Sequence, residues 1–72
     1  MKVNYIGETI SRLREARNLR QYELAEATGL SPSTICRYEN GDREPGIHHI
    51  ILLAEALGVP VATFFNDIKQ GA

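Results

Sequence analysis

The pattern of apolar and polar positions along the chain predicts short helices and no strand. Apolar residues recur at intervals of three and four, the spacing that places side chains on one face of a helix. Five segments show this spacing, at about 7–17, 21–28, 32–39, 47–57 and 61–66. The sequence therefore predicts an all-α domain of five short helices around one core, at about 6–66. Residues 1–6 are expected to form a loose lead-in, and the polar tail 67–72 is expected to fray.

In each segment the apolar stripe marks the side expected to face the core. Leu19 lies in the short connection after the first helix and is expected to plug the core, while Asn18 is expected to cap that helix. Leu52 falls opposite the buried side of the fourth helix, with Ile51 at its edge. The stripes of the first four helices, in chain order, are Ile6, Ile10 and Leu13, then Leu24, Ala25 and Thr28, then Ile35 and Tyr38, then Ile47, Ile50, Leu53, Ala54 and Leu57.

The stretch from Gln21 to Gly41, QYELAEATGLSPSTICRYENG, predicts two helices joined by a tight turn. Gly29 suits a left-handed helix end, where a side chain would clash. Ser31 can accept hydrogen bonds from the free amides of the next helix, and Pro32 has the φ angle of a first helical residue. Helices linked so closely cross steeply, which leaves one face of the second helix pointing away from the body.

Length and composition exclude several classes of protein. The 72 residues form one domain, and a content of 43% apolar and 24% charged residues is ordinary for a soluble globular protein. One cysteine allows no internal disulfide, which favours a reducing compartment. The N-terminus has no signal-peptide pattern, and no apolar run is long enough to span a membrane. We expect a cytoplasmic protein.

The charged residues of the chain give conflicting indications about whether it binds nucleic acid. The net charge of −1 counts mildly against DNA binding, for which a basic surface is usual. However, six of the eight basic residues are arginines between positions 12 and 43, and arginine suits phosphates and guanine edges. Six acidic residues share that stretch, so the sequence alone does not establish a positive face.

No constellation of residues indicates catalysis, a metal or a cofactor. His48 and His49 are adjacent, so on a helix they point about 100° apart. Together with the distant Cys36 they do not have the spacing of a metal site. No nucleophile–base pattern and no phosphate-binding glycine loop occurs, and we expect no enzymatic activity.

The ordered set of motifs resembles the phage-repressor-type (Cro and cI type, XRE-like) helix-turn-helix domains over about 6–65. The resemblance implies a five-helix lambda-repressor-like fold, with the helix-turn-helix formed by helices 2 and 3. The chain departs from the family at Arg20 and Gly46, where the family often has a capping residue, and at Thr28, which is commonly aliphatic. The matched motifs are Leu13-Arg14 and Arg17, Leu19-x-Gln21-x-x-Leu24-Ala25, Gly29-Leu30-Ser31, Ile35-x-x-Tyr38-Glu39-x-Gly41, and Pro45, Ile50, Leu53-Ala54, Leu57 and Val59.

The third helix carries the candidate base-reading residues. With Ile35 and Tyr38 inward, Ser33 and Arg37 point most directly outward, and Thr34 and Cys36 lie at the two borders. Arg37 can donate two hydrogen bonds to guanine O6 and N7. Ser33 and Thr34 can bond several base edges, and the Thr methyl group can touch a thymine methyl group. The alternative is that this is an ordinary solvated helix face.

Other residues are candidates for contacts with the DNA backbone. Gln21 opens the second helix, where free backbone amides favour a phosphate. By resemblance, Gln21, Asn40 and Arg43 contact phosphates, although Asn40 could instead only cap the third helix and Arg43 could be merely solvated. The resemblance also implies a structural ion pair between Arg14 and Glu39, with Arg14 as a further candidate for a phosphate contact.

These features predict a sequence-specific DNA-binding transcriptional regulator, in the form of a repressor that binds a palindromic operator as a homodimer. The partner is double-stranded DNA, read by the third helix in the major groove. Apolar residues outside the core, Ile51, Leu52, Phe65 and Ile68, are the candidate dimer surface. The alternative is an antitoxin or restriction-modification controller that uses this surface to hold a protein partner.

Overall fold

The computed structural model describes residues 5–65, which form four helices and the beginning of a fifth. The four are α1 (Tyr5–Ala16), α2 (Gln21–Thr28), α3 (Pro32–Asn40) and α4 (Ile47–Leu57). A fifth helical segment begins at Thr63 after a turn at 61–62. No strand occurs among these described residues. The prediction of an all-α fold is confirmed.

Two helix starts differ by two residues from the sequence prediction, and the ends of α1 and α3 differ by one residue. α1 begins at Tyr5, so residues 5–6 belong to the helix and not to a loose lead-in. Ile6 packs against the core, and this burial explains the extra length of the helix. The fifth segment begins at Thr63 and not at 61, because the amides of Thr63 and Phe64 donate to carbonyls three residues earlier and form tight turns. Position 66, Ile68 and the tail lie outside the described residues.

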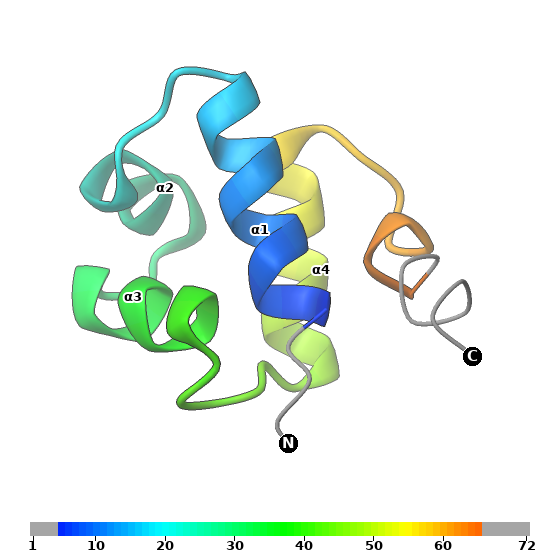
Figure 1. Cartoon of the computed structure of the whole chain (residues 1–72). Helices are drawn as coiled ribbons and strands as arrows, with labels where there is room; N and C mark the ends of the chain where they lie inside the picture. Colours follow the sequence, from blue (N-terminus) through cyan, green and yellow to red (C-terminus); the bar gives the residue numbers. More distant parts are fainter. Residues whose placement is uncertain (1–4, 66–72) are drawn as a thin grey trace.

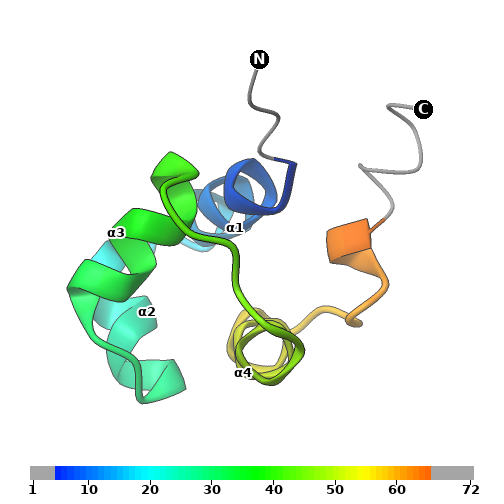
Figure 2. The same cartoon turned by 90° about the horizontal axis from the view of Figure 1, so that it is seen from below.

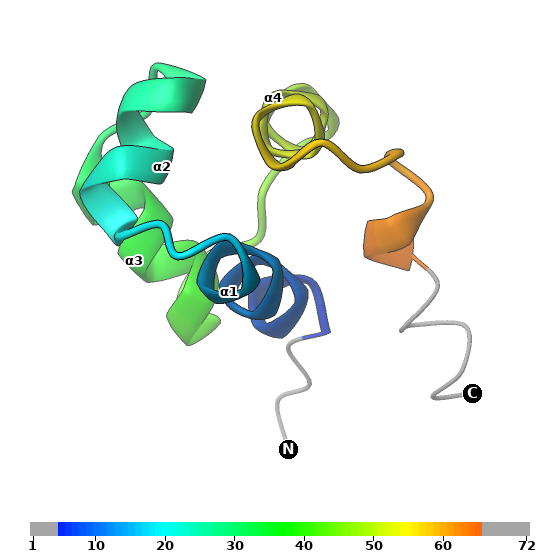
Figure 3. The same ribbon diagram turned by 90° about the horizontal axis from the view of Figure 1, so that it is seen from above.

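α1 and α4 lie side by side and run in nearly the same direction, as all three ribbon views show (Figures 1, 2 and 3). α2 and α3 together cover one side of this pair. The segment that begins at Thr63 lies on the opposite side of α4 (Figures 2 and 3). None of the described helices is long and apolar enough to cross a lipid bilayer.

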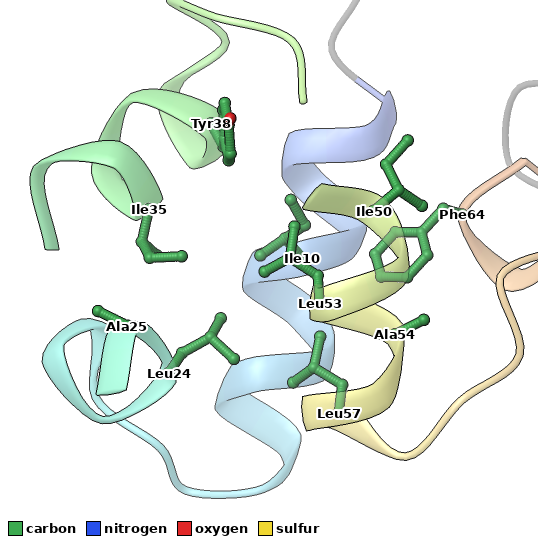
Figure 4. Close-up of a cluster of buried hydrophobic side chains, with 10 residues drawn as sticks. All are labelled: Ile10, Leu24, Ala25, Ile35, Tyr38, Ile50, Leu53, Ala54, Leu57 and Phe64. Atoms are coloured by element: carbon green, nitrogen blue, oxygen red, sulfur yellow. The ribbon is translucent and has the colours of Figure 1, made fainter. Parts of the chain in front are cut away.

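The core lies where α1, α2, α3 and α4 meet, and Phe64 enters it from the opposite side of α4 (Figure 4). Leu19 packs against this core, as the sequence predicted. Ile47 was expected on the buried side of α4 but is 54% exposed, because it is the first residue of α4 and lies at the edge of the packed region. The core residues are Ile10, Leu24, Ala25, Ile35, Tyr38, Ile50, Leu53, Ala54, Leu57 and Phe64.

The ends of α1 and α2 share one capping arrangement. α1 is followed by Asn18 with a φ of 57°, and α2 by Gly29 with a φ of 79°. The next residue in each case donates its amide to a carbonyl five residues earlier, at 3.1 Å for Leu19 to Arg14 and for Leu30 to Ala25. Both leucines then pack against the core, so each helix end turns the chain inward.

Two departures from the family pattern are compensated locally. The Arg20 side chain does not take the place of the usual capping residue of α2. Instead, the carboxylate of Glu23 accepts from the Arg20 backbone amide at 2.7 Å. This is one half of a capping box. The buried hydroxyl of Thr28 donates to the carbonyls of Leu24 and Ala25, at 2.9 and 3.0 Å. A threonine therefore fits a buried position without an unpaired polar atom.

Candidate nucleic-acid interface

α3 has one side buried in the core and the other side exposed, and we call the exposed side its outer face. Ile35 and Tyr38 are buried, whereas Ser33 and Arg37 are exposed, and Thr34 is half-buried. This is the orientation that the sequence predicted for the third helix. α3 therefore presents a hydroxyl and a guanidinium outward, one turn apart, from a helix whose other side is fixed in the core.

The first turn of α3 is fixed by its own hydrogen bonds. The Ser31 hydroxyl oxygen accepts from the Thr34 amide at 3.1 Å, and the two side-chain hydroxyls lie 2.9 Å apart. Pro32 occupies the first helical position, where the missing N–H removes no helical bond. The Thr34 hydroxyl is thus engaged at the cap, whereas the exposed Ser33 side chain has no hydrogen bond to another residue within 5–65.

A polar cluster holds α3 to α1 and α2. The Arg14 guanidinium donates two hydrogen bonds to the Glu39 carboxylate, from Nε at 2.7 Å and from Nη2 at 3.1 Å. A third donor, Arg14 Nη1, reaches the Leu19 carbonyl at 2.7 Å. The Gln21 side-chain amide donates to the same carboxylate at 3.0 Å. One carboxylate on α3 therefore joins three elements, and the pair predicted by resemblance is present.

The environment of Arg14 shows why it serves the fold. The hydrogen bonds that Arg14 donates to Glu39 and the nearby negative charges of Glu39 and Glu15 raise the pKa of Arg14, against the lowering effect of burial. Arginine is already charged at neutral pH, so the shift changes no protonation state. The Arg14 side chain is 12% exposed and its guanidinium is occupied on three nitrogens. A phosphate contact from Arg14 stays a prediction that this geometry does not favour.

The end of α3 places two candidate backbone-binding residues in the open. Asn40 is exposed, and its side-chain amide donates to the Cys36 sulfur at 3.4 Å, so it does not cap α3 with its side chain. Gly41, with a φ of 82°, ends the helix, and the Asp42 amide donates to the Arg37 carbonyl at 2.9 Å. Arg43 follows and is exposed. These residues lie at the opposite end of α3 from Ser33.

One contact at this site could not be read from the sequence. The Tyr38 hydroxyl and His49 Nδ1 lie 2.6 Å apart, and their rings are tilted with centroids 6.0 Å apart. The bond joins α3 to α4 across residues eleven positions apart. Only the fold brings these two side chains together. By contrast, the contact between Glu23 and Arg20 follows the three-residue spacing of a capping box and could have been found from the sequence.

The arginine-rich stretch is largely at the surface. Five of its six arginines are exposed, and the exception is Arg14. Arg37 and Arg43 lie on α3 and in the loop that follows it, but the acidic Asp42 and Glu44 are exposed in the same loop. The site thus depends on where individual guanidinium groups lie and not on a large positive surface.

A steeply crossed helix pair that holds one helix rigidly and exposes its hydrogen-bonding face defines the helix-turn-helix class of DNA-binding domain. Comparison with known proteins agrees with this class. The profile of the helix-turn-helix family matches residues 10–64. The chain belongs to the helix-turn-helix family of DNA-binding transcriptional regulators of the phage-repressor (Cro/cI, XRE-like) type.

Individual relatives support the same assignment. The chain is 36% identical over 55 residues to the cryptic phage CTXphi transcriptional repressor RstR of Vibrio cholerae, covering 76% of this chain and 50% of that protein. The fold is similar to that of the restriction-modification controller protein C.AhdI from Aeromonas hydrophila, with a TM-score of 0.83, 32% identity, and coverage of 86% of this chain and 94% of the other.

A third similar structure is that of the P22 c2 repressor in complex with a synthetic operator. It has a TM-score of 0.77 and 27% identity, and covers 82% of this chain and 89% of the other. The chain spans between 19% and 62% of the length of the first three curated relatives it matches. The similarity therefore concerns their helix-turn-helix part.

Proposed function

We propose that this chain is a cytoplasmic transcriptional repressor that binds a palindromic operator as a homodimer, with α3 in the major groove. The observation that carries the proposal is the outer face of α3. Ser33 and Arg37 are exposed there, while Arg14, Gln21 and Glu39 hold the other side of the helix in place. A rigid helix with free hydrogen-bonding groups is what direct readout of base edges requires.

The residues of α3 divide into two roles. Arg37 takes the role of a guanine reader, and Ser33 that of a hydroxyl reader of neighbouring base edges. Thr34 contributes mainly through its methyl group, because its hydroxyl is engaged with Ser31. Gln21, Asn40 and Arg43 take the role of backbone contacts, which set the position of the domain but carry little sequence information. Gln21 has one N–H committed to Glu39, which orients the rest of its amide.

The homodimer is proposed from the apolar side chains that the fold leaves at the surface. Ile47, Ile51 and Leu52 on α4 and Phe65 beyond it are between 36% and 54% exposed. Such residues outside a core mark interfaces when they gather on one part of a protein. A dimer that binds two half-sites of one operator must hold its α3 helices about 34 Å apart, one turn of DNA. Ile68, predicted to extend this surface, lies outside the described residues.

Selection of bound sites from a random DNA pool tests the proposal. The expected result is one preferred sequence with two-fold symmetry, bound more tightly than random duplex at every salt concentration. The Arg43→Ala variant should then weaken all sequences about equally and reduce the slope of log affinity against log salt by about 1. A pool that yields no preferred site at any salt would contradict the proposal.

The second candidate function is that of a restriction-modification controller or antitoxin, in which the same apolar side chains hold a different protein. The exposed α4 residues and the similarity to C.AhdI favour it. Sedimentation of the purified chain over a range of concentrations separates the two candidates. The control variant is Tyr22→Ser, which alters an exposed apolar residue on α2. Self-association is supported if the chain forms a dimer that Leu52→Asp abolishes and Tyr22→Ser leaves intact. A monomer at every concentration supports a different partner.

A further inference from the structure

α4 has one exposed face that no other helix of the described chain covers. The exposed residues of this face follow the spacing of a single helical side, and the buried residues of α4 lie on the opposite side. α1, the α2–α3 pair and the segment that begins at Thr63 surround α4 on three sides, and the fourth side is open within 5–65 (Figures 2 and 3). The residues of this exposed face are His48, Ile51, Leu52 and Glu55.

The side chains of this face are arranged symmetrically about its midpoint. Ile51 and Leu52, which are 39% and 36% exposed, lie at the centre. His48 lies one turn toward the start of α4, and Glu55 lies one turn toward its end. Neither of these two side chains forms a hydrogen bond or an ion pair with another residue within 5–65. An imidazole can donate an N–H to a carboxylate whether it is neutral or charged, so each group is a suitable partner for the other.

This order of groups is complementary to itself when two copies pack in opposite directions. In a two-fold dimer every contact occurs twice, with the roles of the two copies exchanged. If two α4 helices lie antiparallel with Ile51 of one copy against Leu52 of the other, His48 of each copy meets Glu55 of the other. A parallel arrangement would instead place like residues opposite each other. The pattern therefore favours antiparallel packing with a second copy of this chain.

Antiparallel packing of α4 also suits a dimer that binds one duplex. α2 and α3 lie on one flank of α4 (Figure 2). A two-fold axis perpendicular to α4 and directed toward this flank brings two exposed α4 faces together in opposite directions. Both α3 helices then remain on the same side of the dimer, which binding to two half-sites of one operator requires.

We propose that His48 and Glu55 determine which chain is accepted as the dimer partner, through two reciprocal contacts between antiparallel α4 helices around Ile51 and Leu52. The proposal rests on the homodimer of the proposed function and adds its packing, its register and its selective residues. A chain that carries a different charge pattern on this face would place like charges opposite each other, which disfavours the wrong partner.

The test exchanges the two groups between copies. His48→Glu places two carboxylates opposite each other at both contacts, whereas Glu55→His places two imidazoles there. Sedimentation at one pH and one salt concentration gives the dissociation constant of the dimer for the wild type, each variant, the double variant and an equimolar mixture of the two single variants. Circular dichroism first shows that each variant is folded. Glu26→His is the matched control, because it makes the same replacement at an exposed position of α2.

The wild type should dimerise, and His48→Glu should weaken the dimer about ten-fold or more, since like charges then face each other. The mixture of His48→Glu with Glu55→His should form a heterodimer tighter than the dimer of either variant alone, because each contact again joins a carboxylate to an imidazole. The double variant should dimerise about as tightly as the wild type for the same reason. Glu26→His should leave the dissociation constant unchanged.

Two results would overturn this inference and leave the homodimer in place. One is a wild-type dimer that neither single substitution weakens. The other is a pair of variants that do not prefer each other in the mixture, because the two residues would then not meet across the interface. A wild type that stays monomeric at every concentration would overturn the proposed homodimer, and this inference with it.

Discussion

Replacing Glu39 by glutamine tests whether the polar cluster fixes α3. The Glu39 carboxylate accepts two hydrogen bonds from Arg14 and one from Gln21. Glutamine has the same shape, but it removes the negative charge and turns an N–H donor toward groups that are themselves donors. The Arg14 and Glu39 side chains are only 12% and 6% exposed, so water cannot fully replace the lost partner.

The magnitude follows from this burial. Removing one partner of a buried ion pair costs about 3–5 kcal/mol, and we take the lower end because Arg14 keeps some contact with water. A chain of 72 residues has a free energy of unfolding of roughly 4–11 kcal/mol. Glu39→Gln should therefore remove a large part of the stability. A loss of about 3 kcal/mol corresponds to a fall in Tm of roughly 12–24 °C for a domain of this size.

Urea titration followed by circular dichroism measures the loss, and Glu15→Gln is the matched control. Glu15 lies 3.8 Å from the same arginine, but its side chain is 69% exposed. Its replacement should change the free energy of unfolding by less than about 1 kcal/mol. Equal losses for the two variants would refute the reasoning. The apolar double variant Arg14→Met with Glu39→Leu should recover much of the stability, since no unpaired charge remains.

Three further substitutions test the packing and the turns by the same urea titration. Leu53→Ala, at a fully buried core position, should cost about 2–5 kcal/mol, and a loss below 1 kcal/mol would contradict the described core. Gly29→Ala should cost about 1 kcal/mol or more, because a φ of 79° strains a residue with a side chain. The cost comes from the backbone conformation, since an added Cβ atom would meet no neighbour within 4 Å. An unchanged urea midpoint would mean that the turn is misassigned. Tyr38→Phe should cost about 0.5–1.5 kcal/mol through the lost bond to His49, and no loss in this variant would show that the bond adds no stability.

The fold was largely predictable because local chemistry fixes it. Within each helix, the three- and four-residue spacing of apolar residues predicted which side faces the core. Ile10, Leu24, Ile35 and Leu53, each on the predicted inner side of its helix, are buried. Turn residues marked where helices stop, and Asn18 indeed adopts a φ of 57°. Ile47 was placed wrongly, because periodicity defines the face of a helix but not whether the rest of the protein extends far enough to cover its first turn.

The site was predictable in outline and not in detail. The outward orientation of Ser33 and Arg37 follows from the positions of two buried neighbours on one helix. The engagement of the Thr34 hydroxyl with Ser31 depends on the side-chain rotamers at the cap. The pairing of Tyr38 with His49 depends on where the fold places α4 relative to α3, which no spacing within either helix encodes.

The central claim is that the outer face of α3 reads DNA sequence, and Arg37 tests it most directly. Affinities of the wild type and Arg37→Ala are compared on the selected operator, on every single-base variant of one half-site, and on random duplex, at one salt concentration. Arg17→Ala is the control, because Arg17 is an exposed arginine outside α2 and α3.

The account predicts that Arg37→Ala loses preference at one base pair of the half-site, worth about 1–3 kcal/mol, while its affinity for random duplex changes much less. Arg17→Ala should keep the full preference at that base pair. Equal weakening of every duplex by Arg37→Ala, with the base preference intact, would contradict the claim.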